Sequence, residues 1–178
     1  MKIVTLLTLC ALALQAEAQQ ANELTKKWWL SPTLGVVLEQ RRMPAGGFTF
    51  NRNIGPFSSI AVRTVLGGEL FNRRSPGLKF TDLGVLYGLS VKSFYLGAGL
   101  SWLRGVKRGV FLSGPQPSDL IAMNNYQKVK YSTVGIPYEL RWIPLKSTTF
   151  GVGLSLNGNL SNQFSYTVIG LSIYGGKL

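Results

Sequence analysis

Strict alternation of apolar and polar residues between Tyr131 and Asn157 is the feature that most constrains what this chain can fold into. The first alternating segment sets Val134, Ile136, Tyr138, Leu140 and Trp142 against Thr133, Gly135, Pro137, Glu139 and Arg141. The second sets Phe150, Val152, Leu154 and Leu156 against Thr149, Gly151, Gly153, Ser155 and Asn157. A period of two predicts β-strands with two chemically different faces. The apolar faces either cover a soluble core or contact lipid around a narrow polar lumen.

Six further segments carry the same alternation, at residues 28–40, 46–53, 58–71, 79–91, 94–104 and 164–174. No segment after residue 18 shows sustained helical periodicity, so the chain is predicted to be all-β. Strands of about 9 to 14 residues can cross a bilayer at a tilt, and an even number of them can close without a free edge. We therefore expect a closed, eight-stranded antiparallel up-and-down transmembrane β-barrel with a polar lumen filled by side chains.

The connections and the aromatic residues favour the membrane alternative. Connections after the second, fourth and sixth strands are short, whereas the other side includes the long connection at residues 105–127. Outer-membrane barrels have short periplasmic turns and longer external loops. One set of strand ends carries Trp28, Trp29, Phe94, Trp142, Phe150 and Tyr174, and the other carries Phe71, Phe80, Trp102, Tyr131 and Phe164. Two such girdles are typical of a membrane barrel with both termini in the periplasm, while a soluble periplasmic β-barrel or sandwich is the alternative.

The first 18 residues have the pattern of a secretory signal peptide. Lys2 is followed by an apolar run and by the sequence Ala16-Glu17-Ala18, which fits a cleavage site. We expect a cleaved signal peptide at residues 1–18 and a single barrel domain at residues 19–178. Cys10 would leave with the signal, so the exported domain would be stabilised without disulfides.

Composition excludes several classes of function. The chain has no histidine, which removes Ser-His and Cys-His nucleophiles and histidine-based metal sites. Its glycines alternate along strands and form no phosphate-binding loop. We therefore expect a protein that is not an enzyme and has no catalytic, cofactor or metal site. The net charge of +12 on an exported chain indicates anionic membrane surfaces, not nucleic acid, as the counterpart.

Six charged residues fall on the predicted inward faces of the strands. They are Glu39, Arg63, Glu69, Asp82, Glu139 and Arg141. Buried charges are tolerable only when they are paired and hydrogen-bonded, so we expect a structural network with partners for Glu139 and Arg141 on neighbouring strands. A catalytic carboxylate pair or an ion path is the functional alternative, but a filled barrel gives a substrate no access.

Basic residues also gather in the predicted external connections. They are Arg41, Arg42, Arg73, Arg74, Arg104, Lys107 and Arg108, with Lys128 and Lys130 at the end of the long connection. One interpretation is a solvated rim that keeps the external end soluble. The other is a rim that faces lipopolysaccharide phosphates, which Arg and Lys bind by charge-assisted hydrogen bonds.

Two stretches, TVGIPYEL at residues 133–140 and GLSIYGGKL at residues 170–178, complete the pattern. Together with the signal peptide and the eight alternating segments, they resemble small outer membrane β-barrel proteins, including the PorT-like group and the OmpA-OmpX-like superfamily. The resemblance implies a Gram-negative outer membrane location and a structural, docking or accessory role in the cell envelope, with protein secretion among the roles of relatives. We expect partners among outer membrane lipids, lipopolysaccharide and envelope proteins that contact residues 105–127. A narrow channel for small solutes and a soluble periplasmic binding module are the alternatives.

Overall fold

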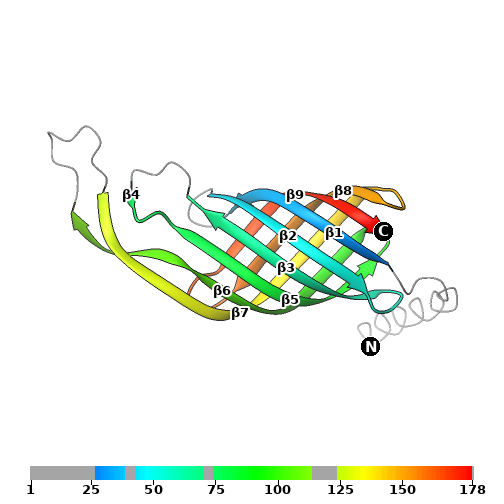
Figure 1. Cartoon of the computed structure of the whole chain (residues 1–178), viewed down its shortest axis with the longest axis horizontal. Helices are drawn as coiled ribbons and strands as arrows, with labels where there is room; N and C mark the ends of the chain where they lie inside the picture. Colours follow the sequence, from blue (N-terminus) through cyan, green and yellow to red (C-terminus); the bar gives the residue numbers. More distant parts are fainter. Residues whose placement is uncertain (1–26, 39–42, 70–73, 114–123, 178) are drawn as a thin grey trace, which may run out of the picture.

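The computed structural model of this chain describes residues 27–38, 43–69, 74–113 and 124–177. Eight of the strands in these ranges form a closed antiparallel barrel, as the sequence predicts (Figure 1). They are β1 (Trp28–Val37), β2 (Met43–Asn53), β3 (Ser58–Gly68), β5 (Lys79–Val91), β6 (Phe94–Ser113), β7 (Asn124–Lys146), β8 (Phe150–Leu160) and β9 (Tyr166–Lys177). Each pairs with its neighbours along the chain, and β1 pairs with β9 to close the ring. Within the described ranges, no helix has the length and apolar character that crossing a membrane requires.

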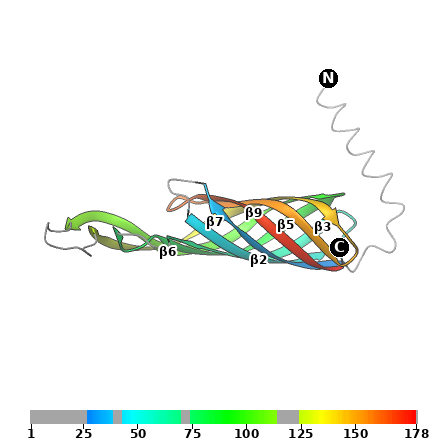
Figure 2. The same cartoon turned by 90° about the horizontal axis from the view of Figure 1, so that it is seen from above.

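The barrel has two unlike ends. The start of β1 pairs with the end of β9 at Trp28 and Lys177, and we call this the terminal end. At the opposite end, residues 107–113 of β6 and 124–129 of β7 continue past the other strands and pair with each other (Figures 1 and 2). We call this projecting hairpin the arm. The two-residue β4 (Arg74–Ser75) pairs in parallel with β7 at the arm and is not part of the ring.

The arm differs from the sequence-based prediction, which placed a connection at residues 105–127. Residues 105–113 and 124–127 are strand, and residues 114–123 lie outside the described residues. Val110, Phe111 and Leu112 are exposed one after another. Since the arm encloses no lumen, its residues need not alternate in polarity, and its pairing register also shifts between Arg108 and Ser113. The period-two signal is therefore lost where the strands leave the barrel.

Burial follows the alternation along each barrel strand, with apolar side chains outside and polar ones inside. Leu34 on β1 and Leu100 on β6 are 76% and 68% exposed, whereas Arg63, Asp82 and Arg141 are at most 1% exposed. This arrangement is the reverse of that in a water-soluble domain. Where the paired strands β5 and β6 approach closely, a glycine faces inward: a Cβ atom on Gly99 would lie 1.9 Å from the carbonyl oxygen of Val85.

The lumen is filled by three layers, whose order follows from β1. Trp29, Tyr95, Ile143 and Tyr174 form an apolar layer at the terminal end. Val37, Met43, Ala45, Val65, Phe80, Leu103, Tyr131, Tyr166 and Val168 form a second apolar layer at the arm end. Between them lies a polar belt that includes Thr33, Thr49, Arg63, Asp82, Glu139, Arg141, Asn157, Asn159 and Ser172. The predicted side-chain-filled lumen is thus present, and apolar layers close it on both sides.

The aromatic girdles match the prediction only in part. Trp28, Phe94, Trp142, Phe150 and Trp102 are exposed on the outer face, but Trp29, Tyr174, Phe80 and Tyr131 are buried in the lumen. Phe164 packs against the arm-end layer, and Phe71 lies outside the described residues. A position near a strand end does not determine which face a side chain takes. Because adjacent residues point to opposite faces, Trp28 contacts the outside and Trp29 the lumen.

Candidate functional site

The first charge pair of the polar belt joins Arg63 on β3 to Asp82 on β5. The guanidinium donates to Asp82 Oδ2 over 3.0 Å and to the carbonyl oxygens of Tyr138 and Gly158 over 2.9 and 3.0 Å. Asp82 Oδ2 also accepts hydrogen bonds from Asn159 Nδ2 at 3.0 Å and from the Tyr166 hydroxyl at 2.6 Å. These bonds connect five strands across the lumen, namely β3, β5, β7, β8 and β9. The pair therefore stabilises the barrel from inside.

The second charge pair joins Glu139 and Arg141, which lie two residues apart on β7. Arg141 Nε donates to Glu139 Oε1 over 2.7 Å, a second guanidinium nitrogen contacts the same oxygen, and Thr49 Oγ1 accepts from Arg141 over 2.6 Å. The structure differs here from the expectation of partners on neighbouring strands. Residues i and i+2 of a strand share a face, so their side chains can pair directly.

Aromatic rings enclose the Arg141 guanidinium on the side of the terminal-end layer. Its central carbon lies 4.8 Å from the ring centre of Trp29, 5.4 Å from that of Tyr174 and 5.9 Å from that of Tyr95. Cation–π contacts of this kind gain strength when both groups are removed from water. Arg141 thus bridges the polar belt and the apolar layer that closes the lumen.

Glu69 and Glu39 do not join these pairs in the described structure. Glu69 forms a salt bridge with Arg108 at the base of the arm, where Arg108 Nη1 donates to Glu69 Oε1 over 3.1 Å and the Leu78 N–H donates to Oε2 over 3.1 Å. Glu39 lies outside the described residues. The six inward charges expected from the sequence therefore include two buried pairs in the belt and one residue that ties the arm to the barrel.

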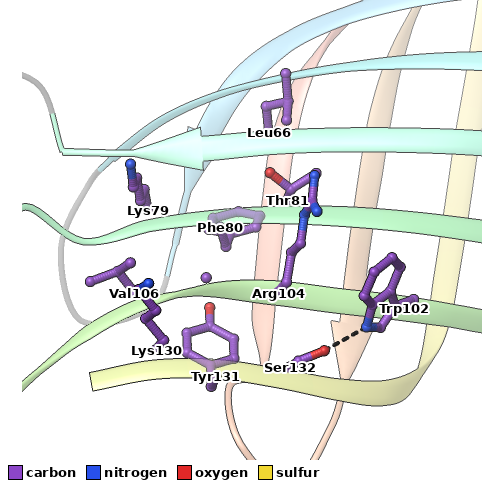
Figure 3. A pocket seen from close by; sticks show the side chains of 11 residues that line it. Leu66, Lys79, Phe80, Thr81, Trp102, Arg104, Val106, Lys130, Tyr131 and Ser132 are labelled. Carbon is purple, nitrogen blue, oxygen red and sulfur yellow. Dashed lines mark hydrogen bonds between the residues drawn. The ribbon is translucent and has the colours of Figure 1, made fainter. Parts of the chain in front are cut away.

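A basic groove lies on the outer face of the barrel near the arm, with a volume of 730 Å³ (Figure 3). Strand register arranges its lining in rows that run across β5, β6 and β7. The row nearest the arm is Lys79, Val106 and Lys130, and the next is Thr81, Arg104 and Ser132. The following row, Leu83, Trp102 and Val134, borders the groove, which it lines through Trp102. The Trp102 indole N–H donates to Ser132 Oγ over 2.6 Å, and the Arg104 guanidinium lies 5.5 Å from the Trp102 ring centre. The two rows nearest the arm therefore carry the cations and hydroxyls, and the row beyond them is apolar.

The basic residues singled out from the sequence are spread over several places. Arg104 lies in the groove, Lys107 donates to Gln163 Oε1 over 3.3 Å, and Arg108 pairs with Glu69. Arg74 belongs to β4, and Arg41, Arg42 and Arg73 lie outside the described residues. No sequence pattern marks Lys79, Thr81 or Ser132 as site residues, because only the pairing register brings them beside Arg104.

Comparisons with known proteins concern the fold. No protein-family model matches the chain, and no curated protein matches it in sequence. Neisserial surface protein A is similar in structure, with a TM-score of 0.52 and 12% identity over 84% of this chain and 95% of that chain. The N-terminal β-barrel domain of Pseudomonas aeruginosa OprF has a TM-score of 0.50 and 10% identity, over 85% of this chain and 98% of its own.

The attachment invasion locus protein Ail of Yersinia pestis, solved with the heparin analogue sucrose octasulfate, is similar to the same degree. Its TM-score is 0.50 at 9% identity, over 86% of this chain and 97% of that chain. At such identities the likeness concerns the fold alone, which is that of small eight-stranded membrane barrels. The PorT-like part of the resemblance stays a prediction.

Proposed function

We propose that this chain is a non-enzymatic outer membrane barrel with a structural or docking role in the cell envelope. One observation carries the proposal, namely the reversal of burial between the two faces of the barrel. Side chains such as Leu34 and Leu100 would face water around a soluble barrel, whereas Arg63 and Arg141 are withdrawn from it. Monomeric soluble proteins rarely expose apolar patches larger than a few hundred Å². A belt of lipid around the barrel would remove the free-energy cost of exposing these apolar side chains to water.

Cell fractionation tests the location. The protein should stay with the outer membrane fraction after osmotic shock and a high-salt wash, and should be extracted only by detergent. Release of the folded protein by osmotic shock alone would contradict the proposal and would support the soluble periplasmic module.

A sealed barrel is favoured over a narrow channel because an apolar layer lies on each side of the polar belt. An ion crossing the lumen would have to lose its hydration among Trp29, Tyr95 and Ile143 and again around Phe80 and Tyr166. We expect the purified protein to show no steady single-channel openings in planar bilayers. Stable openings at a fixed conductance would instead favour solute transport.

The basic groove suits contact with phosphate-bearing membrane lipids such as lipopolysaccharide. Its cations lie toward the arm and its apolar row toward the middle of the barrel, which is the order of head group and acyl chain. Replacing Lys79, Arg104 and Lys130 together by Gln should lower retention of diphosphorylated lipid A about tenfold in native mass spectrometry, since three exposed charge contacts contribute about 0.5 kcal/mol each. A matched triple variant at Lys92, Lys146 and Lys177, at the terminal end, should retain the lipid. Equal retention by both variants would contradict the assignment.

The arm is the part of the barrel best suited to docking an envelope protein. Val110 and Leu112 are 70% and 66% exposed in strand segments that no other barrel strand covers. Exposed apolar residues outside a lipid belt favour a protein partner. A mild-detergent pull-down should recover a partner with the wild type and lose it with Val110→Ser/Leu112→Ser. A partner that stays bound to the variant would place the docking surface elsewhere.

A further inference from the structure

Lysines from four separate parts of the chain surround the mouth of the barrel at the terminal end. Lys27 precedes β1, Lys92 lies in the turn between β5 and β6, Lys146 ends β7 and Lys177 ends β9. Together they line a cavity of 210 Å³ that also contacts Trp29 and Tyr95 of the terminal-end layer. We call these four residues the lysine ring. Three residues of the closed terminal-end layer, Trp29, Tyr95 and Ile143, line this cavity, so within the described part of the chain a ligand does not reach it through the lumen.

No described carboxylate compensates these charges. The acidic residues in the described ranges are Glu69, Asp82 and Glu139, and each already forms a salt bridge, with Arg108, Arg63 and Arg141 respectively. Arg52, at the end of β2, adds a further cation, since it lines an adjacent outer groove with Lys27 and Lys177. Like charges gathered at the mouth of a low-dielectric barrel repel one another and attract anions.

Lys92 has a backbone conformation that residues with a side chain rarely adopt. Its φ is +53°, and among the described residues it is the one non-glycine residue with a positive φ. A two-residue hairpin turn of this kind favours Gly, Asn or Asp, because a Cβ atom is strained in the left-handed region. The turn is held in place by a hydrogen bond from the Ile143 N–H to the Ser93 carbonyl oxygen over 2.8 Å. Backbone outliers of this kind cluster at functional sites, which directs attention to the charge of Lys92.

The size and chemistry of the cavity limit its ligand. Small-molecule pockets are typically about 300 to 1,000 Å³, so a cavity of 210 Å³ admits one anionic group and not a whole cofactor. Lysine acts as a flexible point charge and does not impose the planar geometry of an arginine fork, so a ring of lysines suits several separate carboxylates. Lipid head groups surround the outer wall of a membrane barrel, whereas this cavity is lined partly by the lumen-facing Trp29, Tyr95 and Ile143. These features favour an acidic polypeptide over a lipid.

We propose that the lysine ring binds an acidic peptide segment of a partner protein at the terminal end of the barrel, with one carboxylate inserted into the cavity. This inference is separate from the lipid groove and the arm. It rests on the proposed membrane placement only for the partner's location on the aqueous side that the terminal end faces.

Binding of fluorescein-labelled hexaglutamate to the full-length barrel in phosphatidylcholine nanodiscs tests the inference by fluorescence anisotropy. Lys92→Gln/Lys146→Gln should weaken binding about fivefold, because two exposed charge contacts of about 0.5 kcal/mol each are lost. The matched control is Lys107→Gln/Lys128→Gln, which removes the same charge on the arm at the other end and should change affinity less than about twofold. Equal losses in the two double variants, or no binding by the wild type, would overturn the proposal.

The variant Lys92→Gly distinguishes a binding role of the Lys92 charge from a purely structural role of the residue. Removing the strained side chain should raise the thermal unfolding midpoint by about 2 to 4 °C while it weakens hexaglutamate binding. A Gly variant that binds as tightly as the wild type would remove Lys92 from the site. Native mass spectrometry in phosphatidylglycerol nanodiscs covers the lipid alternative: a lipid retained by the wild type and lost from Lys92→Gln/Lys146→Gln, without hexaglutamate binding, would also overturn the proposal.

Discussion

Replacing Arg141 by Met should destabilise the barrel far more than removing an exposed arginine. Arg141 is fully buried, donates to Glu139 and Thr49, and lies within 4.8 to 5.9 Å of the ring centres of Trp29, Tyr95 and Tyr174. Among the described residues, Glu139 Oε2 has no hydrogen-bond partner and Arg141 is the cation that pairs with this carboxylate. Breaking a buried ion pair by removing one partner costs about 3 to 5 kcal/mol. We expect a loss of that size in the free energy of unfolding, since Met fills part of the vacated volume but leaves the charge of Glu139 uncompensated.

Urea titration of the folded barrel in detergent micelles, followed by the heat-modifiable band on gels, measures this loss. The matched control is Arg52→Met, because Arg52 is exposed at the end of β2 and its replacement should change stability by no more than about 0.5 kcal/mol. Glu139→Gln/Arg141→Met should recover part of the loss, since both charges are then absent. If the Arg141 and Arg52 variants unfold at the same urea concentration, the assignment of inner and outer faces is refuted.

Three further predictions concern the packing of the lumen and the arm. Gly99→Ala should cost roughly 1 to 3 kcal/mol, because the new Cβ would overlap the Val85 carbonyl oxygen, whereas Gly175→Ala, with no described atom within 4 Å of the added Cβ, should cost little. Urea unfolding compares the two variants, and equal midpoints would contradict the close approach of the paired strands β5 and β6. Tyr166→Phe should cost about 1.5 to 3 kcal/mol through loss of its hydrogen bond to Asp82 in the same assay, and an unchanged midpoint would exclude that bond. Glu69→Gln should speed tryptic cleavage in the arm, because the salt bridge to Arg108 is lost, while Lys92→Gln should leave the cleavage rate unchanged. An unaltered cleavage rate for Glu69→Gln would show that the salt bridge does not hold the arm against the barrel.

Alternation, together with the even number of segments and the alternating lengths of their connections, was sufficient to predict the closed barrel, because every barrel strand has two chemically different faces. The fourth predicted strand, at residues 79–91, has the observed bounds of β5, and Arg63, Asp82, Glu139 and Arg141 point inward as the period of two requires. The period-two alternation does not predict the arm. Its strands hydrogen-bond to each other where no lumen exists, so the constraint that produces alternation is absent.

The pairing of charges and the groove depend on register, which the pattern leaves open. Glu139 and Arg141 are close enough to pair within one strand, a choice that periodicity does not distinguish from cross-strand pairing. Lys79, Arg104 and Lys130 come together only because Lys79 pairs with Val106 and Val106 with Lys130. Trp29 and Tyr174 were predicted for a girdle because they lie near strand ends. They point into the lumen instead, since alternate residues of each strand take opposite faces.

The central claim, that the apolar faces contact lipid, is tested most directly by Trp28 and Trp29. These neighbours lie on opposite faces, with exposed fractions of 42% and 6%. Two single-tryptophan variants, each with the other three tryptophans replaced by Phe, would be folded into vesicles that contain brominated phosphatidylcholine, which quenches indole fluorescence on contact. We predict strong quenching of the variant that retains Trp28 and little quenching of the one that retains Trp29. Equal quenching of the two, or stronger quenching of Trp29, would contradict the proposed membrane barrel.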